Sequence, residues 1–317
     1  GACDPDRLAL LAVTLDGGAD AGTGTPVDDG GADAGTGTGI AGGRFAGVAR
    51  LSALAGFLAR AGLFADAADE LERAEDAGAV TATEREWISA YVAVDAPHLA
   101  IRRASRGWRW PPDADEIWKA RAAYPIPFAE LVARVERERG LPRHLISAIA
   151  RKESLFDPRA VSWVGALGMM QMMPRTYETN RVRAGLPPLA PGEIPGPAAS
   201  IRAASHELAW LLERFDGQLP LAIMGYNGGP AAVARWLERS GDTPLDVFVE
   251  KASFTQTRNY VRRVTRTLTR YRLLAGEPPP DLPETARRVA APADAKAAHR
   301  EGAEGDGGDE STSAPDN

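Results

Sequence analysis

The stretch Leu141–Ser154 reads LPRHLISAIARKES and decides the fold class of the chain. Leu145, Ile149 and Glu153 follow one another at intervals of four residues, which places their side chains along one face of a helix. Pro142 suits the first turn of that helix. The stretch therefore predicts a buried helix whose apolar stripe continues into a carboxylate.

Glu153 has two interpretations at this position. Burying an ionised carboxyl is costly, so such a group either finds a cation or serves a chemical purpose. Arg151 and Arg159 are the nearby candidates for an ion pair. The helix alone favours the ion pair, and the residues that follow have to decide between the two interpretations.

Three later segments change that balance. Gly165–Pro174 reads GALGMMQMMP, Gly225–Pro230 reads GYNGGP, and Phe254–Val261 reads FTQTRNYV. Separately, the first is ordinary for core methionines and the second for a turn. In this order after RKES at Arg151–Ser154, they resemble the catalytic domain of the soluble lytic transglycosylases. The resemblance covers roughly residues 125–275.

The resemblance implies a lysozyme-like, goose-type fold and cleavage of the peptidoglycan glycan. The glutamate of the family's ES pair is its catalytic acid and base, which implies this role for Glu153. The family's serine nine residues further on helps to orient that carboxylate. In this chain that serine is Ser162. The other motifs imply five further substrate-binding residues: Met170, Gln171, Tyr226, Asn227 and Tyr260.

The residue types at these positions suit acid–base chemistry on a sugar. An apolar stripe and methionine neighbours raise the pKa of a carboxylic acid by desolvation, so Glu153 is expected to hold a proton near neutral pH. Tyr226 offers a ring face to a sugar, while Asn227 and Gln171 offer hydrogen-bond donors. The set predicts a general acid inside a sugar-binding cleft.

The number of carboxylates bears on the reaction type. Most glycosidases use two, but the matched motifs contain only Glu153, and Asp157, Glu178 and Glu250 fall outside the motif positions. One carboxylate suffices when the substrate's N-acetyl carbonyl stabilises the anomeric centre and its 6-hydroxyl attacks. The sequence therefore favours a lytic transglycosylase, which makes a 1,6-anhydro sugar, over a hydrolytic lysozyme. The alternative from another class is a non-catalytic wall-binding scaffold.

Some positions depart from the family pattern. Gly225 stands where alanine is usual, Gln256 where glutamate is usual and Ser253 where proline is usual. The other departures are the proline-rich loop 186–197, Ser200 and Ala204. They bear on the fit of the substrate more than on catalysis.

The chain has 317 residues and a net charge of −6 that is unevenly distributed. Residues 1–43 and 276–317 each contribute −6, which leaves +6 for the body between them. A basic body suits an anionic polymer such as the bacterial cell wall; nucleic acid is disfavoured because no basic-aromatic motif appears. The single cysteine and the four widely spaced histidines show no metal-ligand spacing, so we expect neither a metal nor another cofactor.

Low complexity marks both ends of the chain. DGGADAGTGT begins at Asp16 and again at Asp29, and a segment so poor in apolar residues cannot offset its ordering entropy. We therefore expect residues 1–43 to be a disordered linker. Calcium binding by its aspartates is the alternative, but their spacing fits no known calcium loop. The acidic residues 276–317 are expected to be disordered as well.

Residues 44–124 show apolar side chains at helix spacing, such as Leu54 and Phe57, and Thr83 with Glu86 forms a capping box. We interpret this region as a short tetratricopeptide-like helical stack. Its small residues favour a packing role over the binding of a specific peptide. Binding of protein partners by this region is the alternative.

A periplasmic or cell-envelope location follows from the substrate, the glycan strands of peptidoglycan. Gly1-Ala2-Cys3 resembles the end of a lipoprotein signal, with Cys3 as the lipidated residue. A chance match of three residues is equally compatible, so the lipid anchor stays an alternative.

Overall fold

The computed structural model describes residues 44–78 and 80–287, and its regular structure is almost entirely helical, as predicted. The first helices are α3 (Ala46–Leu51), α4 (Ala53–Arg60), α5 (Phe64–Asp76), α6 (Glu84–Ala93), α7 (Pro97–Ala104) and α8 (Ile117–Ala123), with a 3₁₀ turn, η1, at Ala114–Glu116. The later helices are α9 (Ala129–Glu138), α10 (Leu145–Ser154), α11 (Pro174–Arg183), α12 (Pro197–Arg214), α13 (Leu219–Gly228), α14 (Pro230–Ser240), α15 (Leu245–Lys251) and α16 (Thr255–Leu274). The strands β1 (Thr243–Pro244) and β2 (Thr285–Ala286) pair antiparallel.

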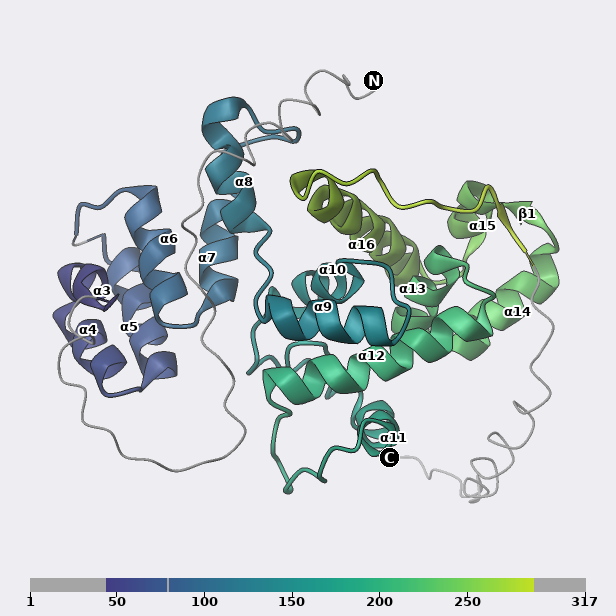
Figure 1. Ribbon diagram of the computed structural model, residues 1–317, viewed down its shortest axis with the longest axis horizontal. Helices are drawn as coiled ribbons and strands as arrows, with labels where there is room; N and C mark the ends of the chain where they lie inside the picture. Colours follow the sequence, from purple (N-terminus) through teal and green to yellow (C-terminus); the bar gives the residue numbers. More distant parts are fainter. Residues whose placement is uncertain (1–43, 79, 288–317) are drawn as a thin grey trace, which may run out of the picture.

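Figure 1 shows these helices in two groups, α3–α8 and the larger α9–α16. The predicted linker 1–43, with Cys3, and residues 288–317 of the predicted tail lie outside the described residues. No helix in the described ranges is both long and apolar enough to cross a membrane.

Helix ends in the first group follow their local sequence. The capping box is confirmed: the Thr83 hydroxyl accepts from the backbone N–H of Glu86, and the Glu86 carboxylate accepts from that of Thr83. Gly62 and Gly78 follow α4 and α5 with φ of 76° and 61°, where a side chain would be strained.

Small residues decide which face of α4 is buried. A Cβ on Gly56 would lie 2.5 Å from the Cβ of Ala49, so only glycine allows α3 and α4 to approach this closely. Leu54 and Phe57, which supplied the apolar spacing of this helix, are 52% and 60% exposed. The spacing predicted the helix, but the close approach of the two backbones turned the larger side chains outward.

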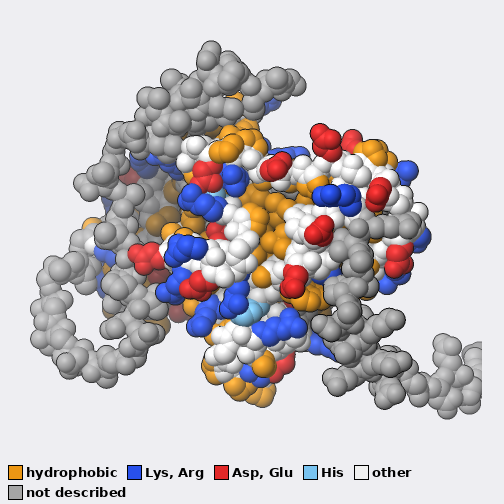
Figure 2. Space-filling view, turned by 45° about the vertical axis from the view of Figure 1, so that its right-hand side comes forward, with side chains coloured by type: hydrophobic (Ala, Val, Ile, Leu, Met, Phe, Trp, Pro, Cys, Tyr) orange, Lys and Arg blue, Asp and Glu red, His pale blue; other side chains and the backbone are white. Residues whose placement is uncertain are grey.

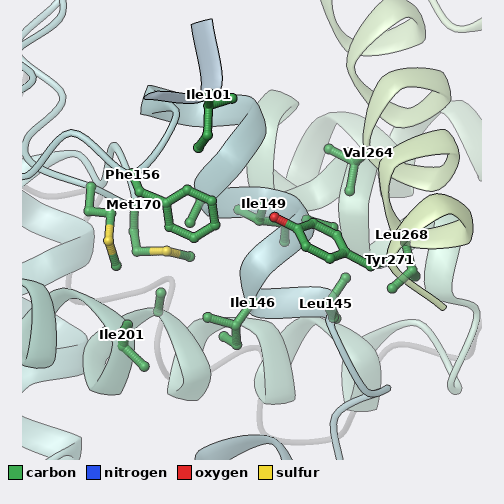
Figure 3. Close-up of a cluster of buried hydrophobic side chains, with 14 of the residues drawn as sticks. Ile101, Leu145, Ile146, Ile149, Phe156, Met170, Ile201, Val264, Leu268 and Tyr271 are labelled. Carbon is green, nitrogen blue, oxygen red and sulfur yellow. The ribbon is translucent and has the colours of Figure 1, made fainter. Parts of the chain in front are cut away.

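The core of the second group surrounds α10. Ile149 is fully buried and lies between α12, which contributes Ile201, and α16, which contributes Val264 (Figure 3). Ile101 of α7 belongs to the same buried cluster. The helix that carries Glu153 is therefore packed on one side by the second group and on another by the first.

A buried carboxylate caps the N-terminus of α10. Glu136 on α9 accepts hydrogen bonds from the backbone N–H groups of His144 and Ile146, at 2.9 and 3.0 Å. The first N–H groups of a helix have no partner within it. The helix therefore begins at Leu145, three residues after the Pro142 at which the sequence predicted its first turn.

Glu136→Gln is expected to destabilise the protein by about 1–3 kcal/mol, because an amide has a single oxygen acceptor and one buried N–H would face its NH₂ group. Burial raises the pKa of Glu136 to about 7 from 4.5, although its two hydrogen bonds lower it. Between these values the folded chain holds a proton that the unfolded chain has lost, so this group's contribution to stability falls as pH rises. The difference between wild type and variant should narrow from pH 5 to pH 8 in urea unfolding. Glu138→Gln, an exposed change on the same helix, is the control; equal effects of both changes would refute the capping role.

An aromatic and cationic cluster holds α10 against the segment that joins the two groups. Arg151 Nε donates to the carbonyl of Ala123 at 2.8 Å, and its guanidinium lies 4.2 Å from the centre of the Tyr124 ring. Arg270 on α16 donates to the Tyr124 hydroxyl oxygen at 2.6 Å. The cluster links the first group, α10 and α16, and so fixes the helix end that carries Glu153.

Residues 276–287 differ from the disordered tail that we expected from composition. Ala286 in β2 is fully buried, and the side-chain amide of Gln218 exchanges two hydrogen bonds with the backbone of Arg287, at 3.0 and 2.8 Å. The composition was averaged over the whole predicted tail, so it did not reveal this short ordered segment. The segment is buried because β2 pairs with β1, which lies earlier in the chain.

Candidate active site

Glu153 lies in the last turn of α10, which ends at Ser154. Leu155 follows with a left-handed φ of 55°, so the chain turns away and leaves the carboxylate at the open end of the helix. Tyr260 on α16 is 3% exposed, and its hydroxyl donates a hydrogen bond to Glu153 Oε1 at 2.5 Å. The structure thus joins two predicted site residues from distant parts of the chain.

Burial raises the pKa of Glu153 above its ordinary value, whereas the hydrogen bond from Tyr260 and the charge of Lys152 lower it. Desolvation is the largest of these causes, so the protonated form is favoured. Burial and the charge of Glu153 raise the pKa of Tyr260 as well, and its hydroxyl therefore stays a donor. The pair is suited to hold a proton and release it.

The ion-pair interpretation of Glu153 is not supported by the positions of the arginines. Arg151 also donates to the hydroxyl oxygen of Ser105 at 3.1 Å, and Arg159 Nη2 lies 3.3 Å from Asp69 Oδ1. Both guanidinium groups are thereby directed to the first group of helices, and the carboxylate has Tyr260 as its hydrogen-bond donor.

Residues 160–172 form a short loop with paired backbones. Leu167 and Met172 exchange two hydrogen bonds, at 2.9 and 3.2 Å. Ser162 closes a turn within the loop, because its Oγ accepts from the backbone N–H of Ala166 at 2.9 Å. The structure therefore binds Ser162 to its own loop, while its hydroxyl proton stays available to orient another group.

Gln171 and Met170 hold the loop in place. Gln171 Nε2 donates to the carbonyls of Ala160 and Gly168, at 3.0 and 2.9 Å. Both amide protons are therefore used within the loop, which differs from the free donor that the sequence suggested. Met170 is fully buried, and its carbonyl accepts from the Tyr226 hydroxyl at 2.8 Å. Met170 contributes through its backbone and its core packing.

Tyr226 and Asn227 lie in the last turn of α13. Asn227 Oδ1 accepts from the Thr257 hydroxyl at 3.0 Å, so the asparagine NH₂ group is directed elsewhere. A Cβ on Gly228 would lie 2.7 Å from Thr257 Oγ1. Glycine at this position therefore allows α13 and α16 to approach, and with them the predicted site residues on both helices.

Residues 130–248 match the family model described as Transglycosylase SLT domain. The chain carries an SLT domain. The matched range ends before α16, which carries Tyr260. The motif in Phe254–Val261 had already pointed to this residue, and the structure places its hydroxyl against Glu153.

Relatives that match this part of the chain are named as lytic murein transglycosylases. The soluble lytic murein transglycosylase of Escherichia coli (strain K12) is 31% identical over 169 residues, which cover 52% of this chain and 26% of that protein. Membrane-bound lytic murein transglycosylase C of Haemophilus ducreyi is 29% identical over 167 residues, 45% of each chain. The chain spans about a quarter of the length of its Escherichia coli relative.

Solved structures resemble more of the chain than the SLT domain alone. An inactive mutant of the lytic transglycosylase Slt from Pseudomonas aeruginosa matches with a TM-score of 0.56 and 27% identity, covering 74% of this chain and 38% of that one. The 70 kDa soluble lytic transglycosylase Slt70 from Escherichia coli matches with a TM-score of 0.57 and 26% identity, covering 70% and 36%. The similarity therefore extends into the helices before α9.

The SLT domain holds a second half-buried carboxylate that our sequence analysis did not single out. Glu207 on α12 accepts from Asn180 Nδ2 at 2.6 Å, and burial raises its pKa. Burial, then the charges of Glu153 and Glu207, raise the pKa of the Tyr226 hydroxyl. Glu207 continues the buried stripe of α12 three residues after Ala204, so the criterion applied to Glu153 would have found it.

Trp163 is the second residue that we missed. It lies beside Ser162 in the turn of the 160–172 loop and is 97% exposed. A loop held by backbone hydrogen bonds fixes this turn, so the indole ring is presented to solvent without its own packing. The signal in the sequence was a large aromatic residue in a short segment that contains Ser162 and Gly165.

The unusual Gly225 has a packing reason. A Cβ there would lie 2.8 Å from Leu211 Cδ2 and 3.0 Å from Phe215 Cε2. Glycine therefore matches the large side chains at the C-terminal end of α12, against which α13 packs. This departure from the family pattern concerns the packing beneath Tyr226.

Proposed function

We propose that this protein is a peptidoglycan lytic transglycosylase that cleaves the MurNAc–GlcNAc β-1,4 bond and forms 1,6-anhydro-MurNAc. The observation that carries the proposal is the half-buried Glu153 of the SLT domain, hydrogen-bonded by Tyr260 at 2.5 Å and with a raised pKa. The names of the relatives support the same activity.

In the proposed reaction, Glu153 acts first as an acid and then as a base. Its proton passes to the glycosidic oxygen as the bond to the anomeric carbon breaks, and the N-acetyl carbonyl of the sugar stabilises that carbon. The carboxylate then takes the proton of the 6-hydroxyl, whose oxygen bonds to the anomeric carbon. Tyr260 stabilises the anionic intermediate form of Glu153 by its hydrogen bond.

The proposed substrate lies in the periplasm or cell envelope, which places the proposed activity there. Glycan strands are the proposed partner of the site. Protein partners of α3–α8 and lipidation of Cys3 stay hypotheses.

Digestion of purified sacculi in ¹⁸O-labelled water is expected to give products that carry no label at the new sugar end. The reason is that the attacking oxygen comes from the substrate's own 6-hydroxyl, so the products should also be lighter than hydrolysis products by one water. Mass spectrometry measures both, with a hydrolytic muramidase on the same sacculi as control. Labelled reducing ends would make this protein a lysozyme-type hydrolase, for which Glu207 would be the carboxylate to test next.

A further inference from the structure

A second concavity lies outside the candidate active site. It is an open cavity of about 560 Å³ between the C-terminal ends of α9 and α11 and the C-terminal half of α12. The residues that define it are Arg139, Arg183, His206, Trp210 and Glu213. None of the predicted site residues lines it.

Positive charge dominates this cavity. Arg139 and Arg183 both line it, with the exposed Arg202 one turn before His206 on α12. Glu213 is the carboxylate among the lining residues. Cations are common at helix C-termini because the helix dipole favours them, but that effect explains each arginine separately and not their convergence on one cavity. Figure 2 shows Lys and Arg side chains clustered beside a strip of hydrophobic ones on one face of the molecule.

His206 experiences the combined charge of this cluster. Burial, then the charges of Arg139, Arg183 and Arg202, lower its pKa. The imidazole is therefore neutral near pH 7 and has one N–H to donate. An anion bound here would offset the arginine charges and raise the pKa of His206.

One wall of the cavity is apolar. Trp210 forms it together with the smaller side chains of Ala209 and Leu212. Arg214 supports the indole, with its guanidinium 5.6 Å from the ring centre. A ligand that fits this wall has an apolar portion next to its negative charge.

We propose that the cavity between α9, α11 and α12 binds the carboxylates of a short acidic peptide. Arginine guanidinium groups match carboxylates in geometry, and the open cavity admits a peptide from solvent. The apolar stem of a peptide can lie on Trp210. Inorganic phosphate can pair with the arginines but has no apolar group to contact Trp210, so it should bind more weakly than the peptide.

The test titrates the full chain with the tripeptide Ala-Glu-Glu and, separately, with inorganic phosphate, by calorimetry at fixed ionic strength. The variant combines Arg139→Gln with Arg183→Gln. The control combines Arg134→Gln with Arg137→Gln, which removes two exposed arginines from α9 outside the cavity. We expect the cavity variant to bind the peptide at least about tenfold more weakly, and the control to stay within about twofold of wild type.

The imidazole resonances of His206 report the place of binding. The peptide should raise the pKa of His206 in wild type and in the control but not in the cavity variant. If the cavity variant and the control lost affinity equally, the net charge of the protein would explain the binding, and the proposal would be overturned. Binding of phosphate as tight as that of the peptide, or no binding of the peptide to wild type at millimolar concentration, would overturn it too.

Discussion

Glu153→Gln is expected to abolish cleavage of sacculi while the fold persists. The amide keeps the size of the side chain, and its oxygen can still accept from Tyr260, but it cannot give or take a proton at neutral pH. General acid–base catalysis contributes about 10²–10⁴-fold in rate, and one group serving as both acid and base should place the loss at the upper end or beyond it. Turbidity loss of purified sacculi measures the rate.

A melting curve and a sacculus pull-down serve as controls for this variant. A neutral amide is cheaper to bury than a carboxylate, so the melting temperature should stay level or rise, and binding should survive because Gln171, Tyr226 and Asn227 are unchanged. A variant that melts normally and retains lysis within tenfold of wild type would make Glu153 a structural residue.

The pH dependence of wild-type cleavage follows from the same carboxyl group. The acid step needs the protonated form, and burial raises the pKa of Glu153. The rate should therefore fall as pH rises through that raised pKa.

A chain of residues 44–275 is expected to be less stable than a chain of residues 44–287 by about 3 kcal/mol. The shorter chain loses the buried Ala286 and both hydrogen bonds to Gln218, and a buried amide left without partners is costly. It also loses Glu277, whose carboxylate lies 2.5 Å from Arg143, two residues before α10 begins. Urea unfolding of the two chains measures the difference.

Gln218→Ala in the longer chain is the matched control for this truncation. It removes the same two hydrogen bonds and leaves β2 in place, so it should reproduce part of the loss. Equal stability of the two chain lengths would show that residues 276–287 are dispensable for folding, as composition alone had indicated.

The sequence by itself determined the helices and many of their ends. Apolar spacing, the Thr83–Glu86 capping box and the glycines after α4 and α5 are local signals, because a helix forms from contacts between residues a few positions apart. The ordered motifs also identified Glu153 and, through the family resemblance, Tyr260. Glu207 also follows a buried apolar stripe at helix spacing, so the same reasoning could have identified it from the sequence.

Only the tertiary structure decided what each side chain faces. Glu153 meets Tyr260 across 107 residues because α10 and α16 pack together, and Gly56 turns Phe57 outward because α3 and α4 approach at that point. Residues 276–287 are anchored because β1 supplies their partner. These outcomes depend on packing between segments far apart in the chain, and no local pattern of residues encodes the distance between two helices.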